Sequence, residues 1–166
     1  IFISMGCSSD TFNRWKQSVR NLDNMFKCLT LEKGVDKFKN MPCVVVGGGP
    51  STEEFIKYCK KYDLEKKALI IACDASLRRL LKENIKPHIV TRCERKKTLI
   101  FDGVSKEDTK DIYYAAYPWT DPSFFELFEK NIMLFRSNGI CNWTEYKHLS
   151  VDGGVSSANA ALELAY

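Results

Sequence analysis

Several features are missing from this sequence, and each absence excludes a class of protein. No apolar run reaches the roughly 20 residues of a transmembrane helix, and no basic-then-apolar signal segment opens the chain. The seven cysteines include no Cys-x-x-Cys pair, and no histidine lies within short range of a pair of cysteines, so the spacing of a structural zinc site is absent. The net charge of +4 is small, and basic residues alternate with acidic ones rather than forming a nucleic-acid footprint. We therefore expect a cytoplasmic protein with reduced thiols, no membrane span, no bound metal and no nucleic-acid partner.

The residues that are present suffice for one folded domain. The 166 residues are 45% hydrophobic and 12% aromatic, which is enough for a sizeable core. The chain begins at Ile1 rather than at methionine and stops at Tyr166 inside a helical pattern, so we expect a fragment of a longer protein, incomplete at its C-terminus. We divide it into an N-terminal helical extension, residues 1–40, and an α/β domain, residues 41–166.

The order of the patterns predicts a parallel sheet covered on both faces. Residues 11–29 carry apolar side chains at a helical period, and we expect this helix to pack on the core. Short apolar runs then alternate with helical patterns, which is typical of a Rossmann-like three-layer α/β fold. The expected strands are residues 43–46, 68–72, 88–91, 111–116 and 131–135, and the expected helices are residues 52–62, 76–84 and 122–129.

A glycine-rich loop follows the first expected strand, and it is the strongest candidate for ligand binding. Glycine lets a ligand approach the backbone closely, and the free amides at the start of the next helix favour an anion. The spacing fits neither the Lys-Ser/Thr phosphate loop nor the dinucleotide GxGxxG pattern. An ordinary tight turn explains the glycines equally well. The loop consists of Gly47, Gly48, Gly49, Pro50 and Ser51.

Two further groups of polar residues follow other elements. Asp74 comes after the second expected strand, and Arg92, Glu94 and Arg95 come after the third, where parallel sheets place ligand contacts. The alternative is that Asp74 caps a helix and that the arginines are solvated. A second glycine turn opens onto the last helix, where the serines can also serve only as caps. Its residues are Gly153, Gly154, Val155, Ser156 and Ser157.

Taken in order, these segments resemble the MptE-like family over about residues 42–166. The resemblance is carried by the GGGPS loop, the CDASLRRLL segment, the Lys-Pro-His turn at residues 86–88 and the late glycine-to-helix turn. That family includes archaeal 6-hydroxymethyl-dihydropterin pyrophosphokinases and Maf-type glycosyltransferases, which attach nonulosonic acids to flagellin. The loop and the late helix are also similar to those of bacterial sialyltransferases that use CMP-sialic acid.

The segment after the third expected strand separates these activities. The pyrophosphokinase branch carries an acidic pair there, which suits Mg²⁺ and the phosphates of ATP. This sequence has a single carboxylate, Glu94, between Arg92 and Arg95. The resemblance therefore implies a Maf-type glycosyltransferase with a CMP-sugar donor, a protein hydroxyl as acceptor and no metal. The alternatives are a pyrophosphokinase that uses ATP and Mg²⁺, or a non-catalytic nucleotide-binding domain of a larger protein.

The resemblance also suggests roles for single residues. The two glycine turns would hold the nucleotide and its phosphate, Asp74 would contact the ribose or the base, and Arg92 and Arg95 would contact the substrate. His148 and Glu94 are the candidate catalytic residues, with His148 as general base. In the sialyltransferases the catalytic histidine follows the late helix, so we expect the true base to lie beyond Tyr166.

Overall fold

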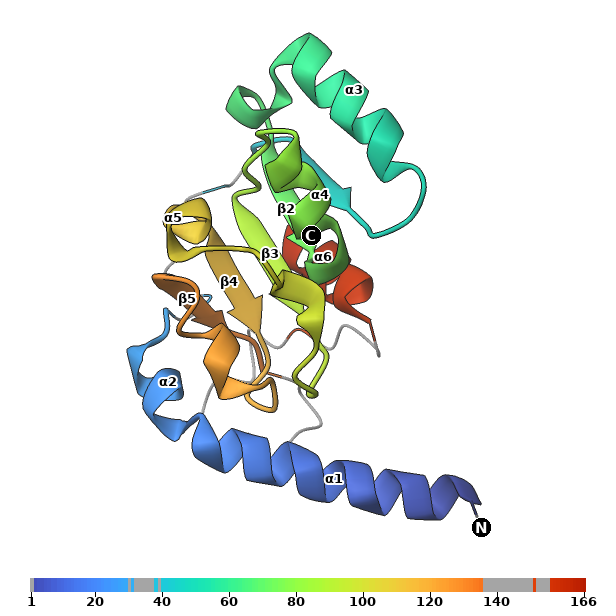
Figure 1. The fold of residues 1–166 in the computed structure, drawn as a ribbon, viewed down its shortest axis with the longest axis vertical. Helices are drawn as coiled ribbons and strands as arrows, with labels where there is room; N and C mark the ends of the chain where they lie inside the picture. The colour runs from blue at the N-terminus through green and yellow to red at the C-terminus, as the bar shows by residue number, and fades with distance from the viewer. Residues whose placement is uncertain (1, 30, 32–37, 39, 136–150, 152–155) are drawn as a thin grey trace.

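The computed structural model describes residues 2–29, 31, 38, 40–135, 151 and 156–166 (Figure 1). Strands and helices alternate through most of this part of the chain, as the apolar pattern predicts. In chain order the elements are α1 (Phe2–Arg20), α2 (Leu22–Lys27), β1 (Cys43–Val46), α3 (Thr52–Tyr62), η2 (Leu64–Lys66), β2 (Leu69–Cys73), α4 (Asp74–Lys82), β3 (Ile89–Arg92), η3 (Leu99–Phe101), α5 (Lys106–Thr109), β4 (Tyr113–Ala116), η4 (Pro122–Phe124), β5 (Lys130–Met133) and α6 (Ser157–Ala165).

The five strands form one parallel sheet in the order β1-β2-β3-β4-β5. Each lies within or beside a range that the sequence predicts, and the predicted Rossmann-like α/β class is confirmed. Because every connection steps in the same direction, right-handed crossovers place all of them on one face of the sheet. The opposite face must therefore be covered by chain that lies before β1 or after β5.

Two apolar clusters lie on the two faces of the sheet. Adjacent strand residues contribute to opposite clusters, as the pleat requires: Ile70 belongs to the first and Ile71 to the second. The first cluster also contains buried residues of α3, α4 and the connections after β3 and β4. The second lies beneath α6, which contacts β1, β2 and β3 and buries two small residues, Ala160 and Ala161. The chain after β5 thus returns to cover the second face.

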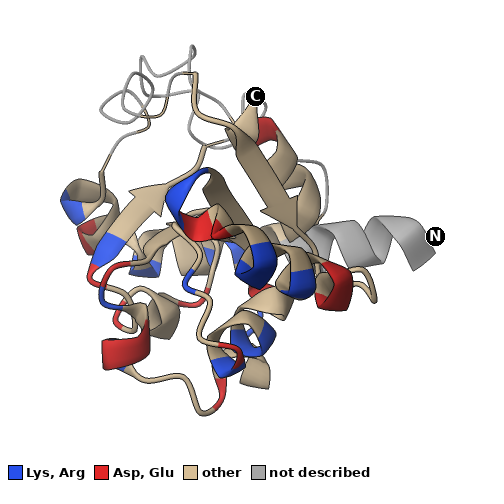
Figure 2. Ribbon diagram, turned by 90° about the horizontal axis from the view of Figure 1, so that it is seen from above, with Lys and Arg blue, Asp and Glu red and all other residues tan. Residues whose placement is uncertain are grey.

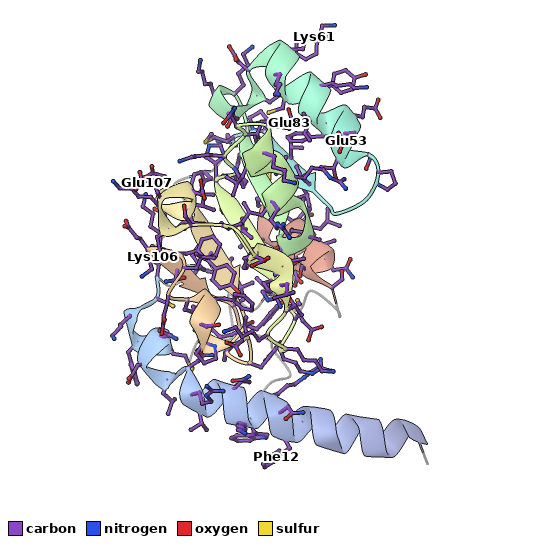
Figure 3. All side chains as sticks on the ribbon, in the orientation of Figure 1. Phe12, Glu53, Lys61, Glu83, Lys106 and Glu107 are labelled. Carbon is purple, nitrogen blue, oxygen red and sulfur yellow. The ribbon has the colours of Figure 1, made fainter. Side chains whose placement is uncertain are left out.

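The N-terminal helix differs from the prediction in two ways. It is divided at Asn21, and most of its predicted apolar face stays exposed: Phe12 is 69% exposed and Phe26 is 88% exposed, whereas Met25 packs against the first cluster. Figure 3 shows Phe12 on the side of α1 that faces away from the sheet. The docking contact also has a polar part, because the buried Asn21 side-chain amide donates to the carbonyl oxygens of Pro118, at 2.7 Å, and Thr120, at 2.6 Å.

The predicted helix at residues 122–129 is also wrong. Only the short turn η4 forms, and side chains bind the carbonyl oxygens that a longer helix would use for its own amides. Asn131 donates to the carbonyl oxygens of Phe125 and Phe128, and the Thr109 hydroxyl donates to that of Leu127 at 2.6 Å. Phe124, Phe125 and Phe128 are buried in the first cluster all the same.

Two other predictions concern the domain boundary and a membrane-spanning helix. The boundary at residue 40 lies beside residues 32–37 and 39, which are outside the described part of the chain, so the division into domains stays a prediction. Among the described helices, none is both long and apolar enough to cross a membrane.

Candidate functional site

The polar residues singled out in the sequence meet at the carboxyl ends of β1, β2 and β3. The glycine loop follows β1, Asp74 is the first residue of α4 directly after β2, and Arg92 is the last residue of β3. These strands are neighbours in register, with Val46 beside Ala72 and Cys73 beside Thr91. Ligands of open parallel sheets bind at this edge. The fold therefore places the predicted loop and the predicted charged residues side by side.

The glycine loop is held by Thr52, the first residue of α3. Its hydroxyl lies 2.7 Å from the carbonyl oxygen of Gly47 and 2.8 Å from that of Gly49, and its amide donates to Gly49. Gly48 packs against α4 so closely that a Cβ there would lie 2.7 Å from the Cβ of Ala75. The fold itself requires a glycine at position 48.

Gly47 and Gly49 have no such packing role. A Cβ at either position would meet no atom within 4 Å, and neither residue has a left-handed φ. The backbone N–H groups of Gly48, Gly49 and Ser51 have no hydrogen-bond acceptor among the described residues. Open space beside unpaired amides at a helix start is the geometry that binds a phosphate or another anion.

Asp74 and Arg92 form an ion pair that the sequence did not reveal. The two oxygens of Asp74 accept hydrogen bonds from Arg92 Nη1, at 2.5 Å, and from the amide of Ala75, at 2.9 Å. The Arg92 side chain is 1% exposed, so it is not the solvated arginine of the alternative interpretation. Asp74 is not the N-cap of α4 that the alternative proposed: the N-cap is Cys73, and among the described backbone amides only the next one, that of Ala75, donates to Asp74.

The rest of the Arg92 guanidinium is held by the loop that follows β3. Nη2 donates to the carbonyl oxygen of Lys96 at 2.9 Å and to the Thr98 hydroxyl at 3.1 Å. The group lies over the ring of Phe124, 4.6 Å from its centroid. Nε is buried and has no partner among the described residues. Arg92 thus fixes the segment that carries Glu94 and Arg95.

Glu94 and Arg95 are both half-buried in this segment. Burial by itself would raise the pKa of Glu94, but hydrogen bonds from the Lys96 and Arg95 amides and the charges of Arg95 and Arg92 outweigh it. The pKa of Glu94 is therefore lowered. A carboxylate of low pKa is a weak proton acceptor at neutral pH, so its environment suits charge stabilisation better than general-base catalysis.

The second glycine turn is described only at its end. Ser156 caps α6 by accepting from the amide of Asn159, and Ser157 accepts from the amide of Cys93 at 3.1 Å. The Thr91 hydroxyl donates to the carbonyl oxygen of Ser157 at 2.8 Å. The start of α6 is thereby fixed to the end of β3, beside the other two groups. His148, Gly153, Gly154 and Val155 lie outside the described residues.

The cysteines near the site are not arranged for nucleophilic chemistry. Burial, with a smaller contribution from the charge of Asp74, raises the pKa of Cys73 to about 11. A thiol of this pKa stays protonated at neutral pH. Within the described part of the chain, no three His, Cys, Asp or Glu side chains converge as metal ligands.

Arg79 and Trp119 make contacts at the site that the sequence did not reveal. Arg79 pairs with Glu53 of α3 at 3.3 Å and donates to the carbonyl oxygen of Gly49 at 3.4 Å, so it connects α4 with the glycine loop. Its place on the predicted helix was visible in the sequence, but the position of α3 beside it was not. Trp119 stacks on Tyr117 and donates to the carbonyl oxygen of Cys93, so it is a buried support of the site.

The fold and this arrangement define a Rossmann-like α/β domain with its candidate site at the carboxyl edge of a parallel sheet. The family described as "6-hydroxymethylpterin diphosphokinase MptE-like" matches residues 16–166. The chain therefore belongs to the MptE-like family, as its motifs indicate.

A solved structure has the same fold. It is the Maf glycosyltransferase from Magnetospirillum magneticum AMB-1, with a TM-score of 0.61 and 23% sequence identity over 76% of this chain. The match spans 21% of the length of that protein, so this chain corresponds to about a fifth of it. No curated protein sequence matches the chain.

Proposed function

We propose that this chain is the nucleotide-binding domain of a Maf-type glycosyltransferase. The donor would be a CMP-activated nonulosonic sugar and the acceptor a protein hydroxyl. The family assignment and the fold shared with the Maf glycosyltransferase support the proposal. The whole enzyme would contain this domain as one part.

The observation that carries the proposal is the open glycine loop. Gly47 and Gly49 leave space that the fold does not require, beside unpaired amides at the start of α3. A nucleoside monophosphate group placed there would receive several backbone hydrogen bonds without any metal. Asp74 follows the neighbouring strand β2, and it would contact the nucleoside, because each of its oxygens can accept a further hydrogen bond besides those from Arg92 and Ala75.

The transfer itself would exchange one bond for another at the anomeric carbon. The acceptor oxygen forms its bond to that carbon while the bond to the phosphate oxygen breaks, and CMP leaves with the electron pair. The loop amides would stabilise the charge that develops on the phosphate. The acceptor hydroxyl also loses a proton, for which His148 remains the candidate base and Glu94, with its lowered pKa, the weaker one.

Pyrophosphate transfer from ATP is the second candidate, because the matching family is described by that activity. It requires carboxylates that are free to bind Mg²⁺. Asp74 is paired with Arg92, and Glu94 accepts from the amide of Lys96 among arginine neighbours. These residues do not fit a magnesium site, so the proposal favours sugar transfer.

Thermal unfolding in the presence of different nucleotides tests the choice. We expect CMP to stabilise the chain without metal, by about 2.7 kcal/mol at a concentration 100 times its Kd. GTP, and ATP with EDTA, serve as comparisons. Stabilisation by ATP only when Mg²⁺ is present would support pyrophosphate transfer instead. If no nucleotide shifts the melting temperature, the domain does not bind nucleotides and the proposal fails.

A further inference from the structure

A hollow of about 680 Å³ lies between α4 and the loop that follows β3, on the outer side of the Asp74–Arg92 pair. We call it the α4 hollow. Its walls are basic and apolar, and it lies next to the glycine loop without including it. The residues that line it are Asp74, Ala75, Arg78, Arg79, Lys82, Arg92, Glu94, Thr98, Leu99 and Ile100.

The α4 wall of the hollow is one face of that helix. Ala75, Arg78, Arg79 and Lys82 follow one another at intervals of three, one and three residues, which places them on the same side. Arg79 is paired with Glu53, but Arg78 and Lys82 have no ion-pair or hydrogen-bond partner among the described residues. Like charges four residues apart destabilise a helix slightly, so stability does not explain this arrangement.

Arg92 supplies the floor of the hollow. Its guanidinium donates to Asp74, to the carbonyl oxygen of Lys96 and to the Thr98 hydroxyl, so it is a fixed cation beneath the basic residues of α4. Four cationic side chains line the hollow against two carboxylates, Asp74 and Glu94, so the hollow attracts anions.

The opposite wall is apolar. Leu99 lines the hollow and is 79% exposed, and Ile100 lies beside it. An anion alone would leave this wall uncovered. A ligand that joins an anionic group to a ring or a chain would cover both walls. In the ribbon of Figure 2, the positions of basic and acidic residues are interspersed along the described chain.

The hollow and the glycine loop share the start of α4. Ala75 lies against Gly48 on one side and lines the hollow on the other, and Arg79 reaches the carbonyl oxygen of Gly49. We propose that the α4 hollow binds a second anionic group, a carboxylate or a phosphate, of a ligand whose first phosphate lies on the glycine loop. The site follows from its own residues, whereas the identity of the whole ligand rests on the proposed function.

Two probes and a pair of matched variants test this site. Inorganic phosphate and free N-acetylneuraminate, a sugar carboxylate, are titrated calorimetrically into the chain saturated with CMP. The variant Arg78→Gln/Lys82→Gln removes two exposed charges of the hollow. The control Lys106→Gln/Lys110→Gln removes two exposed charges at the same spacing, at the first residue of α5 and at the residue directly after it, away from the site. Both variants have the same net charge.

We expect one of the two probes to bind once per chain, and its identity distinguishes phosphate from carboxylate. The α4 variant should bind that probe at least about tenfold more weakly, since each lost charged hydrogen bond contributes about 1.5–3 kcal/mol. The control should keep both affinities, and CMP should bind all three proteins equally. Absence of saturable binding, or equal weakening in the two variants, overturns the proposal.

The two proposals fail separately in this design. If CMP does not bind but a probe does, and the α4 variant weakens it, the nucleotide proposal falls and the hollow remains an anion site. If CMP binds and neither probe does, the nucleotide proposal stands and the α4 hollow is not an anion site.

Discussion

At the scale of single residues, the three glycines after β1 are surrounded differently. Gly48 lies against Ala75, whereas Gly47 and Gly49 face open space. The sequence showed three equivalent glycines and left a tight turn and a phosphate site as equal alternatives. The structure explains one glycine by packing and leaves the other two for a ligand. This difference can be measured with two conservative substitutions.

Gly48→Ala and Gly49→Ala should have opposite effects. We expect Gly48→Ala to lower the free energy of unfolding by about 1–3 kcal/mol, because the new methyl group overpacks against Ala75. Gly49→Ala should keep or slightly raise stability, because alanine restricts the unfolded chain. It should weaken CMP binding, since the methyl group enters the ligand space. Urea denaturation and calorimetry provide the two readings; full CMP affinity in Gly49→Ala would argue against a phosphate at this loop.

The buried Asp74–Arg92 ion pair should contribute far more to the free energy of unfolding than an exposed ion pair does. Asp74→Asn leaves the charge of Arg92 buried without its partner, which typically costs about 3–5 kcal/mol. The control is Glu83→Gln, which breaks the exposed Lys60–Glu83 pair and should cost about 0–1 kcal/mol. The double variant Asp74→Asn/Arg92→Met should recover part of the loss. Equal effects of Asp74→Asn and Glu83→Gln in urea denaturation would contradict the burial of this pair.

His88 should make stability depend on pH. Its Nδ1 accepts a hydrogen bond from the amide of Ile70, and burial lowers the pKa of His88 below its usual 6.5, although the charge of Glu65 opposes this. The unfolded chain therefore binds a proton at a higher pH than the folded chain does. Stability from this group is complete above about pH 6.5 and is lost as the pH falls from there through the lowered pKa.

The comparison is between the wild type and His88→Asn, by urea denaturation from pH 5 to 8. The difference in unfolding free energy between them should shrink as the pH falls below 6.5. A constant difference would show that His88 does not titrate as described. His88 lies before β3, at the end of the sheet opposite the site, so nucleotide binding should be unaffected.

At the scale of elements, the strands were predictable and the connections were not. The apolar runs at residues 43–46 and 69–73 are typical of strands in a sheet covered on both faces, and both form neighbouring strands there, so their pattern predicts their structure. The segment at residues 122–129, by contrast, has a helical pattern in the sequence but forms only the short turn η4. Its carbonyl oxygens are bound by Thr109 and Asn131, which are distant or later in the sequence, and no local pattern reveals this.

In the candidate site, likewise, some features were visible in the sequence and others depend on the fold. The glycine loop and the position of Asp74 after a strand were visible in the sequence. The ion pair with Arg92 joins residues 18 positions apart, and the contact of Gly48 with Ala75 depends on how α4 packs. The basic residues of α4 stand at helical spacing in the sequence, but only the fold makes them one wall of a hollow.

The attachment of the N-terminal helices should depend on the buried side chain of Asn21. Asn21→Leu removes the donor for two carbonyl oxygens, those of Pro118 and Thr120, and unsatisfied buried groups cost about 1–3 kcal/mol. Asn13→Leu makes the same replacement at an exposed position of α1 and should change stability little. Equal stabilities of the two variants in thermal unfolding would contradict the polar docking described for α2.

At the scale of the whole molecule, the one-directional strand order explains how the site is built. The connections on one face bring the loops after β1, β2 and β3 to the same edge, and α6 returns over the other face to the same three strands. Ser157, at the start of α6, is thereby held beside Thr91 and Cys93 at the edge that carries the first glycine loop.

The central claim is that the loop after β1 holds the phosphate of a nucleotide, and amide NMR tests it directly. In a titration of the ¹⁵N-labelled chain with CMP, we expect the largest shift changes at the amides of Gly48, Gly49 and Ser51, with smaller changes around Asp74. Cytidine, which lacks the phosphate, should leave the three loop amides nearly unmoved. If CMP shifts other regions and not this loop, or if cytidine shifts the loop amides as much as CMP does, the glycine loop is a structural turn and not a phosphate site.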